Sequence, residues 1–267
     1  MHELLVGAEE HPRLTWDVAA DRLSLNGREL WPRAAFLRYD VFAQLADPRP
    51  VVAARALAWY TTLCGWLAAH PEVLWLNRRA EQWTPNKLAM LTLARQVGLR
   101  VPSTLVTNDL ATLRRIDPAD TIAKPVADGH CVLLGEALAD GRAIGDALAR
   151  PAIVQERLVA PELRVYLVGD EALGFRVDSP HLDYRVHQQA KLTPVDPRPL
   201  GILERLCELG RSVGYDFGAA DFKTDPRSGE LVFLELNSSP MFAAFDRAAD
   251  GRLCAAIVSA LCPGASS

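Results

Sequence analysis

The sequence lacks a large excess of charge of either sign. It has 29 lysines and arginines against 33 aspartates and glutamates, so the formal net charge is -4. This balance supplies no general basic face for nucleic acid, and the chain has no acidic tail. Glycine and proline number 17 and 18, close to average usage, which argues against low-complexity disorder. We therefore expect a globular protein that does not bind nucleic acid.

Closely spaced cysteine pairs are missing as well. The five cysteines form an odd set with no CxxC spacing, which argues against a disulfide framework and against a zinc site built on ligand pairs. The first twelve residues show no basic segment followed by an apolar run, so we expect no signal peptide. These absences favour a cytoplasmic protein.

Apolar residues are plentiful and make up 49% of the 267 residues. That is enough to bury a core, and the length suits one large or two small domains. The segment 51–69 is the one candidate membrane span, but Arg55 interrupts it. We expect instead a buried helix that carries Trp59, Tyr60 and Trp66, with no membrane association.

Strand and helix patterns are mixed along the chain. Asn26-Gly27 predicts a two-residue hairpin turn, and the turns at 169–171 and 225–229 predict two further hairpins. The other expected strands are 35–39, 73–76, 103–106, 121–124, 152–155, 163–168, 172–177, 218–223 and 230–236. The expected helices are 51–69, 84–97 with Thr84 as N-cap and Pro85 at the first position, 200–213 and 251–261, and 194–199 is expected to be a connector. This mixture favours two α+β lobes over one parallel sheet.

Several common catalytic motifs are absent. The sequence has no GK dipeptide for a P-loop, no GxGxxG and no HExxH. The segment 210–214 matches GxSxG, but Ser212 falls at the end of an expected helix instead of a strand-to-helix turn, so we interpret the match as chance.

A set of oxygen ligands lies on two expected strands. Glu235 and Asn237 are two residues apart, so both should project from one face together with Phe233. Asp221 lies on the neighbouring strand, which can bring its carboxylate beside Glu235. Two carboxylates and an amide oxygen suit Mg²⁺ held together with phosphate oxygens and water. The alternative is an ordinary solvent-facing strand edge.

Cationic side chains occur at matching places. Lys87 opens an expected helix after a loop, and Lys124 ends an expected strand before a proline. Arg164 lies on a strand and Arg185 in a loop, and arginine suits phosphate oxygens. Each residue alone is equally compatible with a solvated surface or a surface ion pair.

Taken in order, these segments resemble the ATP-grasp superfamily of ligases. Some are similar in particular to the graspetide synthetases, maturases that close side-chain lactones and lactams on ribosomal peptides, and more loosely to the ribosomal-protein glutamate ligases. The similarity covers roughly residues 76–261. The segments that carry it are WLN at 75–77, NKL at 86–88, GLRVPSTLVTN at 98–108, AKP at 123–125, QE at 155–156, ELRVYLVGD at 162–170, DYR at 183–185, FGAADF at 217–222 and ELN at 235–237.

The resemblance implies an α+β ATP-grasp fold in which two lobes clamp ATP. The implied divisions are a shortened N-terminal lobe at 1–80, lobe one at 81–154, lobe two at 155–262 and a tail at 263–267. Lobe one should include a flap at 124–145 that covers ATP.

The resemblance also implies roles for individual residues, with ATP and two Mg²⁺ ions as cofactors. Lys87 and Lys124 would contact ATP phosphates, and Lys124, Arg164 and Arg185 would be catalytic, with Arg164 also contacting the nucleotide. Asp221, Glu235 and Asn237 would hold magnesium. An adenine-binding hinge would comprise Gln155, Glu156, Arg157 and Leu158, with Glu156 taking the adenine amino group.

The implied reaction joins a carboxylate to an amine or hydroxyl through an acyl phosphate, on a ribosomal peptide. The segment 237–240, NSSP, is closer to ligases of small substrates, so a small amino acid or carboxylate is the alternative substrate. A non-catalytic nucleotide-binding partner protein is the alternative from another class. The oligomeric state stays open, with a homodimer among the alternatives.

Overall fold

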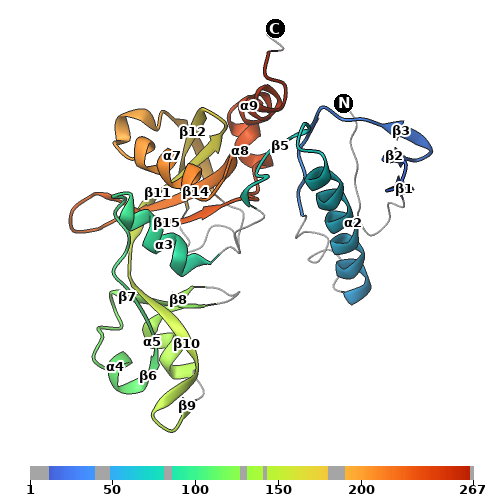
Figure 1. The fold of residues 1–267 in the computed structure, drawn as a ribbon. Coiled ribbons are helices and arrows are strands. Elements are labelled where there is room, and N and C mark those ends of the chain that lie inside the picture. Colours follow the sequence, from blue (N-terminus) through green and yellow to red (C-terminus); the bar gives the residue numbers. More distant parts are fainter. Residues whose placement is uncertain are drawn as a thin grey trace. The chain divides into compact units, whose positions relative to one another are not determined.

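The computed structural model describes residues 12–39, 49–80, 86–126, 131–140, 143–179 and 190–264. The chain divides into two compact units. One comprises Met1–Glu81 and Ile257–Ser267, and the other comprises Gln82–Ala256. Figure 1 colours the chain from blue at the N-terminus to red at the C-terminus.

The first unit begins with a small antiparallel sheet of three strands, β1 (Leu14–Asp17), β2 (Arg22–Leu25) and β3 (Arg28–Leu30). Asn26 and Gly27 join β2 to β3 with φ angles of 53° and 80°. These positive values are what a type I′ hairpin turn requires. The Asn26-Gly27 turn predicted from the sequence is confirmed.

Helix α2 (Pro50–Ala69) follows and confirms the predicted helix, but not its burial. Trp66 is buried in a cluster with Leu67, Leu23 and the segment after the helix, whereas Trp59 and Tyr60 are only half-buried. The prediction of a buried helix is therefore wrong for most of its length. In the described part of the chain, α2 alone is long and apolar enough to cross a membrane, and 17% of its apolar window is buried. One such helix is weak evidence for a membrane span.

Two predicted strands are much shorter than expected. The segment 35–39 contributes only the end of β4 (Ala34–Ala35), and 73–76 contributes β5 (Leu74–Trp75). The two strands pair in parallel over two residues each, so the sequence prediction of longer strands is wrong.

Lobe one of the second unit is a five-stranded sheet in which β6, β10, β7 and β8 are successive neighbours and β9 pairs with β10. Its elements are β6 (Thr104–Asp109), α4 (Leu110–Leu113), β7 (Thr121–Pro125), β8 (Val132–Leu133), α5 (Leu134–Asp140), β9 (Ala143–Ile144) and β10 (Ala147–Glu156). Leu110 and Leu113 of α4 and Leu134 of α5 pack with Ala123 and Val154 of the sheet. Side chains alternate between the two faces along a strand. Lys124 follows Ala123 and Gln155 follows Val154, so Lys124 and Gln155 both project from the opposite face of the sheet.

Lobe two is built on a five-stranded antiparallel sheet in the order β13-β12-β11-β14-β15. Figure 1 labels four of these strands, β12, β11, β14 and β15. Its strands are β11 (Val159–Val168), β12 (Glu171–Asp178), β13 (Lys191–Val195), β14 (Phe217–Thr224) and β15 (Leu231–Asn237). Its helices are η2 (Arg198–Leu200), α7 (Leu203–Ser212) and α8 (Ala243–Ala248), and α9 (Arg252–Leu261) crosses the boundary between the two units at Ala256. Helix α3 (Lys87–Gln96) falls inside the range 81–154 given for lobe one, but it packs against β15 and α7 and is therefore described with lobe two. The β11–β12 and β14–β15 hairpins confirm the sequence prediction.

Two predictions about lobe-two boundaries are corrected. The segment 194–199 was expected to be a connector, yet Pro194 belongs to β13, where it pairs with Phe175. A proline fits there because β13 is an edge strand with one side free of ladder bonds. The N-cap of α3 is Asn86 instead of Thr84, and its Oδ1 accepts hydrogen bonds from the Leu88 and Ala89 backbone amides at 3.0 and 3.1 Å. Thr84 and Pro85 lie outside the described residues.

A β-bulge in β15 changes which side chains share a face. Asp221 pairs with Glu235, but the next residue, Phe222, pairs with Phe233, so Leu234 is the extra residue on β15. Phe222 and Phe233 are both buried and meet edge to face at 5.6 Å. The prediction that Phe233 projects with Glu235 is wrong, because the bulge turns it to the opposite, apolar face.

Candidate active site

One face of the lobe-two sheet carries a row of charged side chains from three adjacent strands. Arg164 of β11 pairs with Asp221 of β14, and Asp221 pairs with Glu235 of β15. Side chains of paired residues project to the same face, so the three lie side by side. The Arg164 Nη1 lies 3.5 Å from the Asp221 Oδ1, and both side chains are largely buried. Asn237 extends the set, because its Nδ2 donates to the Glu235 Oε1 at 3.1 Å.

Aromatic rings hold Arg164 in place. Its guanidinium carbon lies 5.4 Å from the centre of the Tyr166 ring and 5.2 Å from that of Phe245. Tyr166 is itself fixed, since its hydroxyl donates to the Met241 carbonyl at 2.5 Å. Cation–π contact with two rings stabilises the guanidinium at this place beside Asp221. Phe245 belongs to α8, a helix that the sequence pattern did not predict.

Lys124 projects from lobe one and is half-buried. Burial lowers the pKa of its ammonium group, and the positive charges of Lys223 and Lys87 act in the same direction, while Cys131 and Glu235 raise that pKa. The ammonium groups of Lys87 and Lys124 therefore lie within Coulomb range of each other, and Lys124 lies within Coulomb range of Glu235 in the lobe-two row. A partly desolvated cluster of cations favours a bound anion.

The segment 155–158 links β10 of lobe one to β11 of lobe two. Gln155 is 4% exposed, and its Nε2 donates to the Thr104 Oγ1 at 2.9 Å, while its Oε1 has no hydrogen-bond partner among the described residues. A buried acceptor of this kind favours a ligand that can donate a hydrogen bond. Gln155 and Lys124 share one face of the lobe-one sheet.

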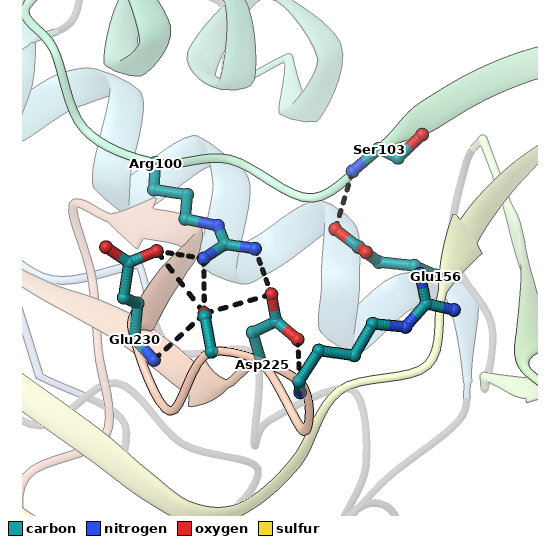
Figure 2. A network of polar contacts seen from close by, with 7 residues as sticks. Arg100, Ser103, Glu156, Asp225 and Glu230 are labelled. Carbon is teal, nitrogen blue, oxygen red and sulfur yellow. Dashed lines mark hydrogen bonds and ion pairs between the residues drawn. The ribbon is translucent and has the colours of Figure 1, made fainter.

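The other residues of the segment 155–158 make contacts within the fold. The residues 97–103, which join α3 to β6, are called the connector from here on. The Glu156 Oε1 accepts from the Ser103 backbone amide at 2.9 Å (Figure 2). The Arg157 amide donates to the Asp120 carbonyl at 2.8 Å, and Leu158 is buried. In this structure the Glu156 carboxylate therefore holds the connector, and its implied role in adenine binding stays a prediction.

Figure 2 shows a second polar network on the same connector. Arg100 forms ion pairs with Asp225 and Glu230, and its Nη1 donates to the Ser228 Oγ at 2.6 Å. The Arg100 carbonyl also accepts from the Phe233 amide at 2.8 Å. This Arg100 network fastens the connector to the β14–β15 turn and was not predicted from the sequence.

Two of the predicted features cannot be placed. Arg185 lies outside the described residues, and so do residues 127–130 and 141–142 of the expected flap at 124–145. No group of three or more histidine, cysteine, aspartate or glutamate side chains suited to a metal occurs among the described residues.

The donor set nevertheless fits a magnesium–nucleotide complex. Mg²⁺ in phosphate-transfer sites takes one or two carboxylates and fills its remaining positions with phosphate oxygens and water. Asp221, Glu235 and Asn237 offer such a set. The cations at Lys87, Lys124 and Arg164 suit the phosphates, and the Gln155 Oε1 suits an amino group of a base. The site fits ATP with magnesium on these grounds.

Comparison with known proteins finds similar proteins among solved structures only. No protein-family model matches the chain, and no curated protein matches it. The ATP-grasp ligase PsnB complexed with minimal precursor is 26% identical, and the match covers 94% of this chain and 86% of that chain at a TM-score of 0.69. PsnB complexed with a phosphomimetic variant of minimal precursor, Mg and ADP is 25% identical. That match covers 95% of this chain and 87% of that chain, also at a TM-score of 0.69.

A third structure shows the fold alone. The Chryseobacterium gregarium RiPP-associated ATP-grasp ligase, in complex with ADP and a leader and core peptide, is 21% identical. The match covers 96% of this chain and 85% of that chain at a TM-score of 0.66. The predicted fold class, a mixed α+β ATP-grasp fold, is confirmed.

Proposed function

We propose that this chain, which has the fold of the ATP-grasp ligases, is an ATP-dependent ligase that modifies a peptide. The observation that carries the proposal is the cross-strand row of Arg164, Asp221 and Glu235, with Lys124 projecting from lobe one within Coulomb range of Glu235. The similarity to PsnB, a ligase complexed with minimal precursor, supports a peptide as the substrate.

The proposed reaction has two steps. A substrate carboxylate takes the γ-phosphoryl group of ATP, which gives an acyl phosphate and ADP. An amine or hydroxyl then attacks the acyl carbon, so that an amide or ester forms and phosphate leaves. Bound magnesium would neutralise charge on the phosphoryl group during transfer, and most of the remaining acceleration would come from positioning.

The chain's own residues would position the reactants. Asp221, Glu235 and Asn237 would hold two Mg²⁺ ions, and Lys87 and Lys124 would bind phosphates. Arg164, fixed by Tyr166 and Phe245, would orient the transferred phosphoryl group with its planar fork of donors. Arg185 is proposed as a second catalytic arginine from the sequence resemblance alone.

The base of the nucleotide would lie at the segment 155–158. Its amino group would donate to the buried Oε1 of Gln155, the acceptor without a partner among the described residues. Because the Glu156 carboxylate accepts from the Ser103 amide and the Arg157 amide donates to the Asp120 carbonyl, the proposal gives adenine recognition to Gln155, to the Arg157 carbonyl and to backbone groups of Leu158. We further propose a cytoplasmic location, where ATP is available.

The proposal is tested by ADP release from Mg·ATP in the presence of candidate acceptors. One arm contains synthetic peptides rich in acidic residues together with lysine, serine or threonine, and the other contains free amino acids and dipeptides. We expect ADP release and loss of one water per new bond in the peptide arm. The matched variants are Asp221→Asn, expected to be inactive, and Asp225→Asn, expected to be active.

The outcome separates the alternatives left by the sequence. Turnover with amino acids but not with peptides would favour a ligase of small substrates, as the segment 237–240 suggested. Tight ATP binding without ADP release in either arm would favour a non-catalytic nucleotide-binding protein. Absence of any Mg·ATP binding would overturn the proposal.

A further inference from the structure

Lys223 is a further cation beside Lys87, Lys124 and Arg164, and it lies on the charged face of the lobe-two sheet. Lys223 is two residues from Asp221 on β14, so the two side chains project in the same direction. Its Nζ lies 2.8 Å from the Glu162 Oε1, and the two side chains are 15% and 14% exposed. Glu162 in turn is two residues from Arg164 on β11. The Lys223–Glu162 pair therefore runs parallel to the Arg164–Asp221 pair, one step along the same two strands.

The step from the Arg164–Asp221 pair to the Lys223–Glu162 pair leads toward the proposed adenine-binding hinge, the segment 155–158. β11 begins at Val159, directly after the segment 155–158, and Val159 pairs with Thr224. Along β14, Lys223 thus comes between the hinge end of the strand and the metal-ligand candidate Asp221. Two residues of a strand span about 7 Å. A nucleotide with its base at the hinge and its outer phosphates at Asp221 would place its sugar and first phosphate over Lys223.

The charge of Lys223 also reaches the other lobe. It is one of the two positive charges that lower the pKa of Lys124, together with Lys87. The ammonium group of Lys223 thus belongs to the same cluster of cations as the lysines that the sequence singled out. A long lysine side chain can turn its ammonium group toward a new anion while its stem stays packed.

We propose that Lys223 is a further phosphate-binding residue, which contacts the phosphate nearest the sugar of the nucleotide. Glu162 is the positioning residue that holds the Lys223 ammonium group over the sheet. The inference rests on the proposed function, because it takes ATP as the ligand. It adds to that function a residue that neither the sequence pattern nor the resemblance assigned.

The test compares four ligands that differ only in phosphate number. Dissociation constants of adenosine, AMP, ADP and ATP are measured by calorimetry for the wild type, Lys223→Met and Lys223→Arg. Lys191→Met, at an exposed lysine of β13 on the same sheet, is the matched control. For Lys223→Met we expect roughly tenfold weaker binding of AMP, ADP and ATP, with unchanged binding of adenosine. Lys223→Arg should recover most of the loss, and Lys191→Met should bind all four as the wild type does.

Other results overturn the inference. Equal losses for adenosine and ATP would show that Lys223 acts through the fold or on the nucleoside, and no loss for any ligand would show that it does not bind phosphate. A loss confined to ADP and ATP would contradict contact with the first phosphate. If the wild type binds none of the four ligands, the proposed function itself fails, which is a different result from wild-type binding with no effect of Lys223→Met.

Glu162→Gln tests the positioning role. In the wild-type background it should weaken ATP binding, and in the Lys223→Met background it should have no further effect. Equal effects in both backgrounds would contradict positioning through Lys223. The double variant also removes both charges of the pair, so it leaves no buried carboxylate unpaired. If Lys223→Met alone does not fold, the binding of adenosine, AMP, ADP and ATP is therefore compared between the double variant and the wild type instead.

Discussion

Two arginine–aspartate pairs involve β14 and the turn that follows it, and they differ in geometry. The Arg164–Asp221 pair is separated by 3.5 Å, and its two side chains are 6% and 16% exposed. In the other pair, Asp225 contacts Arg100 and also accepts from the Arg227 amide at 2.8 Å and the Ser228 Oγ at 3.1 Å. A separation of 3.5 Å is longer than a good charge-assisted hydrogen bond.

We interpret the difference as that between a structural pair and a candidate functional pair. A carboxylate that accepts from a backbone amide, a hydroxyl and a guanidinium has its oxygens satisfied by the fold. Asp225 therefore holds the turn to the connector. Asp221, at longer distance and beside Glu235, lies where a cation and phosphate oxygens could bind. The predictions below test this contrast, beginning with the largest expected effect.

Asp221→Asn should abolish most activity without loss of the fold. The amide keeps the size of the side chain but removes the charge that would hold magnesium, so we expect Mg²⁺-dependent ADP release to fall on the order of 100-fold. The Tm should stay close to that of the wild type. Steady-state ADP release and thermal unfolding measure the two effects, and near-normal turnover would make the metal assignment wrong.

Arginine-to-lysine changes at the two pairs should have opposite consequences. Arg164→Lys loses the planar fork and changes the cation–π contacts with Tyr166 and Phe245, so we expect roughly tenfold slower ADP release. Arg100→Lys loses contacts in the Arg100 network, so we expect a lower Tm with nearly normal turnover. Equal changes in turnover for both variants would remove the distinction between the pairs.

Asp225→Asn should change the acid limb of the stability curve. The hydrogen bond from the Arg227 amide, with help from Ser228 and Arg100, lowers the pKa of Asp225. Because the pKa of Asp225 is lower in the folded than in the unfolded protein, its carboxylate stabilises the fold at pH values above the unfolded-state pKa of about 3.9. This stabilisation is lost as the pH falls through the folded-state pKa. The variant should therefore be less stable than the wild type at neutral pH, and the difference should shrink below about pH 4. Urea unfolding at several pH values measures this, and a constant difference would contradict it.

Lys124→Met should have the smallest effect. We expect it on the free energy of unfolding of the protein without nucleotide. Burial lowers the pKa of Lys124, so its charged form is less favourable in the fold than in the unfolded chain. This cost is relieved as the pH rises from the folded pKa toward the unfolded value of about 10.4. The variant should be at least as stable as the wild type at neutral pH, with the difference shrinking in the alkaline range. A less stable variant at neutral pH would show that Lys124 is structural, like Asp225.

Local signals in the sequence were enough for much of lobe two. Turn residues at 169–171 and 225–229 and the alternation of the flanking strands predicted both hairpins, and the register then brought Asp221 beside Glu235 as expected. Other features depend on contacts that no local pattern encodes. The bulge at Leu234 reverses Phe233, and β13 is a strand only because β12 lies next to it.

The candidate site was predicted in the same uneven way. Lys124 and Asp221 stand out by their place at strand ends and on strand faces. Lys223 follows the same alternation as Asp221, so its side chain could have been predicted on the charged face, but its pairing with Glu162 required the register of β11 against β14. Phe245 has no local signal at all, because it comes to Arg164 from a short helix that follows the sheet.

The most direct test is calorimetric titration of Mg·ATP into the wild type, Asp221→Asn and Asp225→Asn. We expect the wild type and Asp225→Asn to bind with similar dissociation constants that depend on Mg²⁺. Asp221→Asn should bind much more weakly and with little dependence on Mg²⁺. Equal Mg²⁺-dependent binding by Asp221→Asn and the wild type, or loss of binding in Asp225→Asn alone, would contradict the assignment of the two pairs.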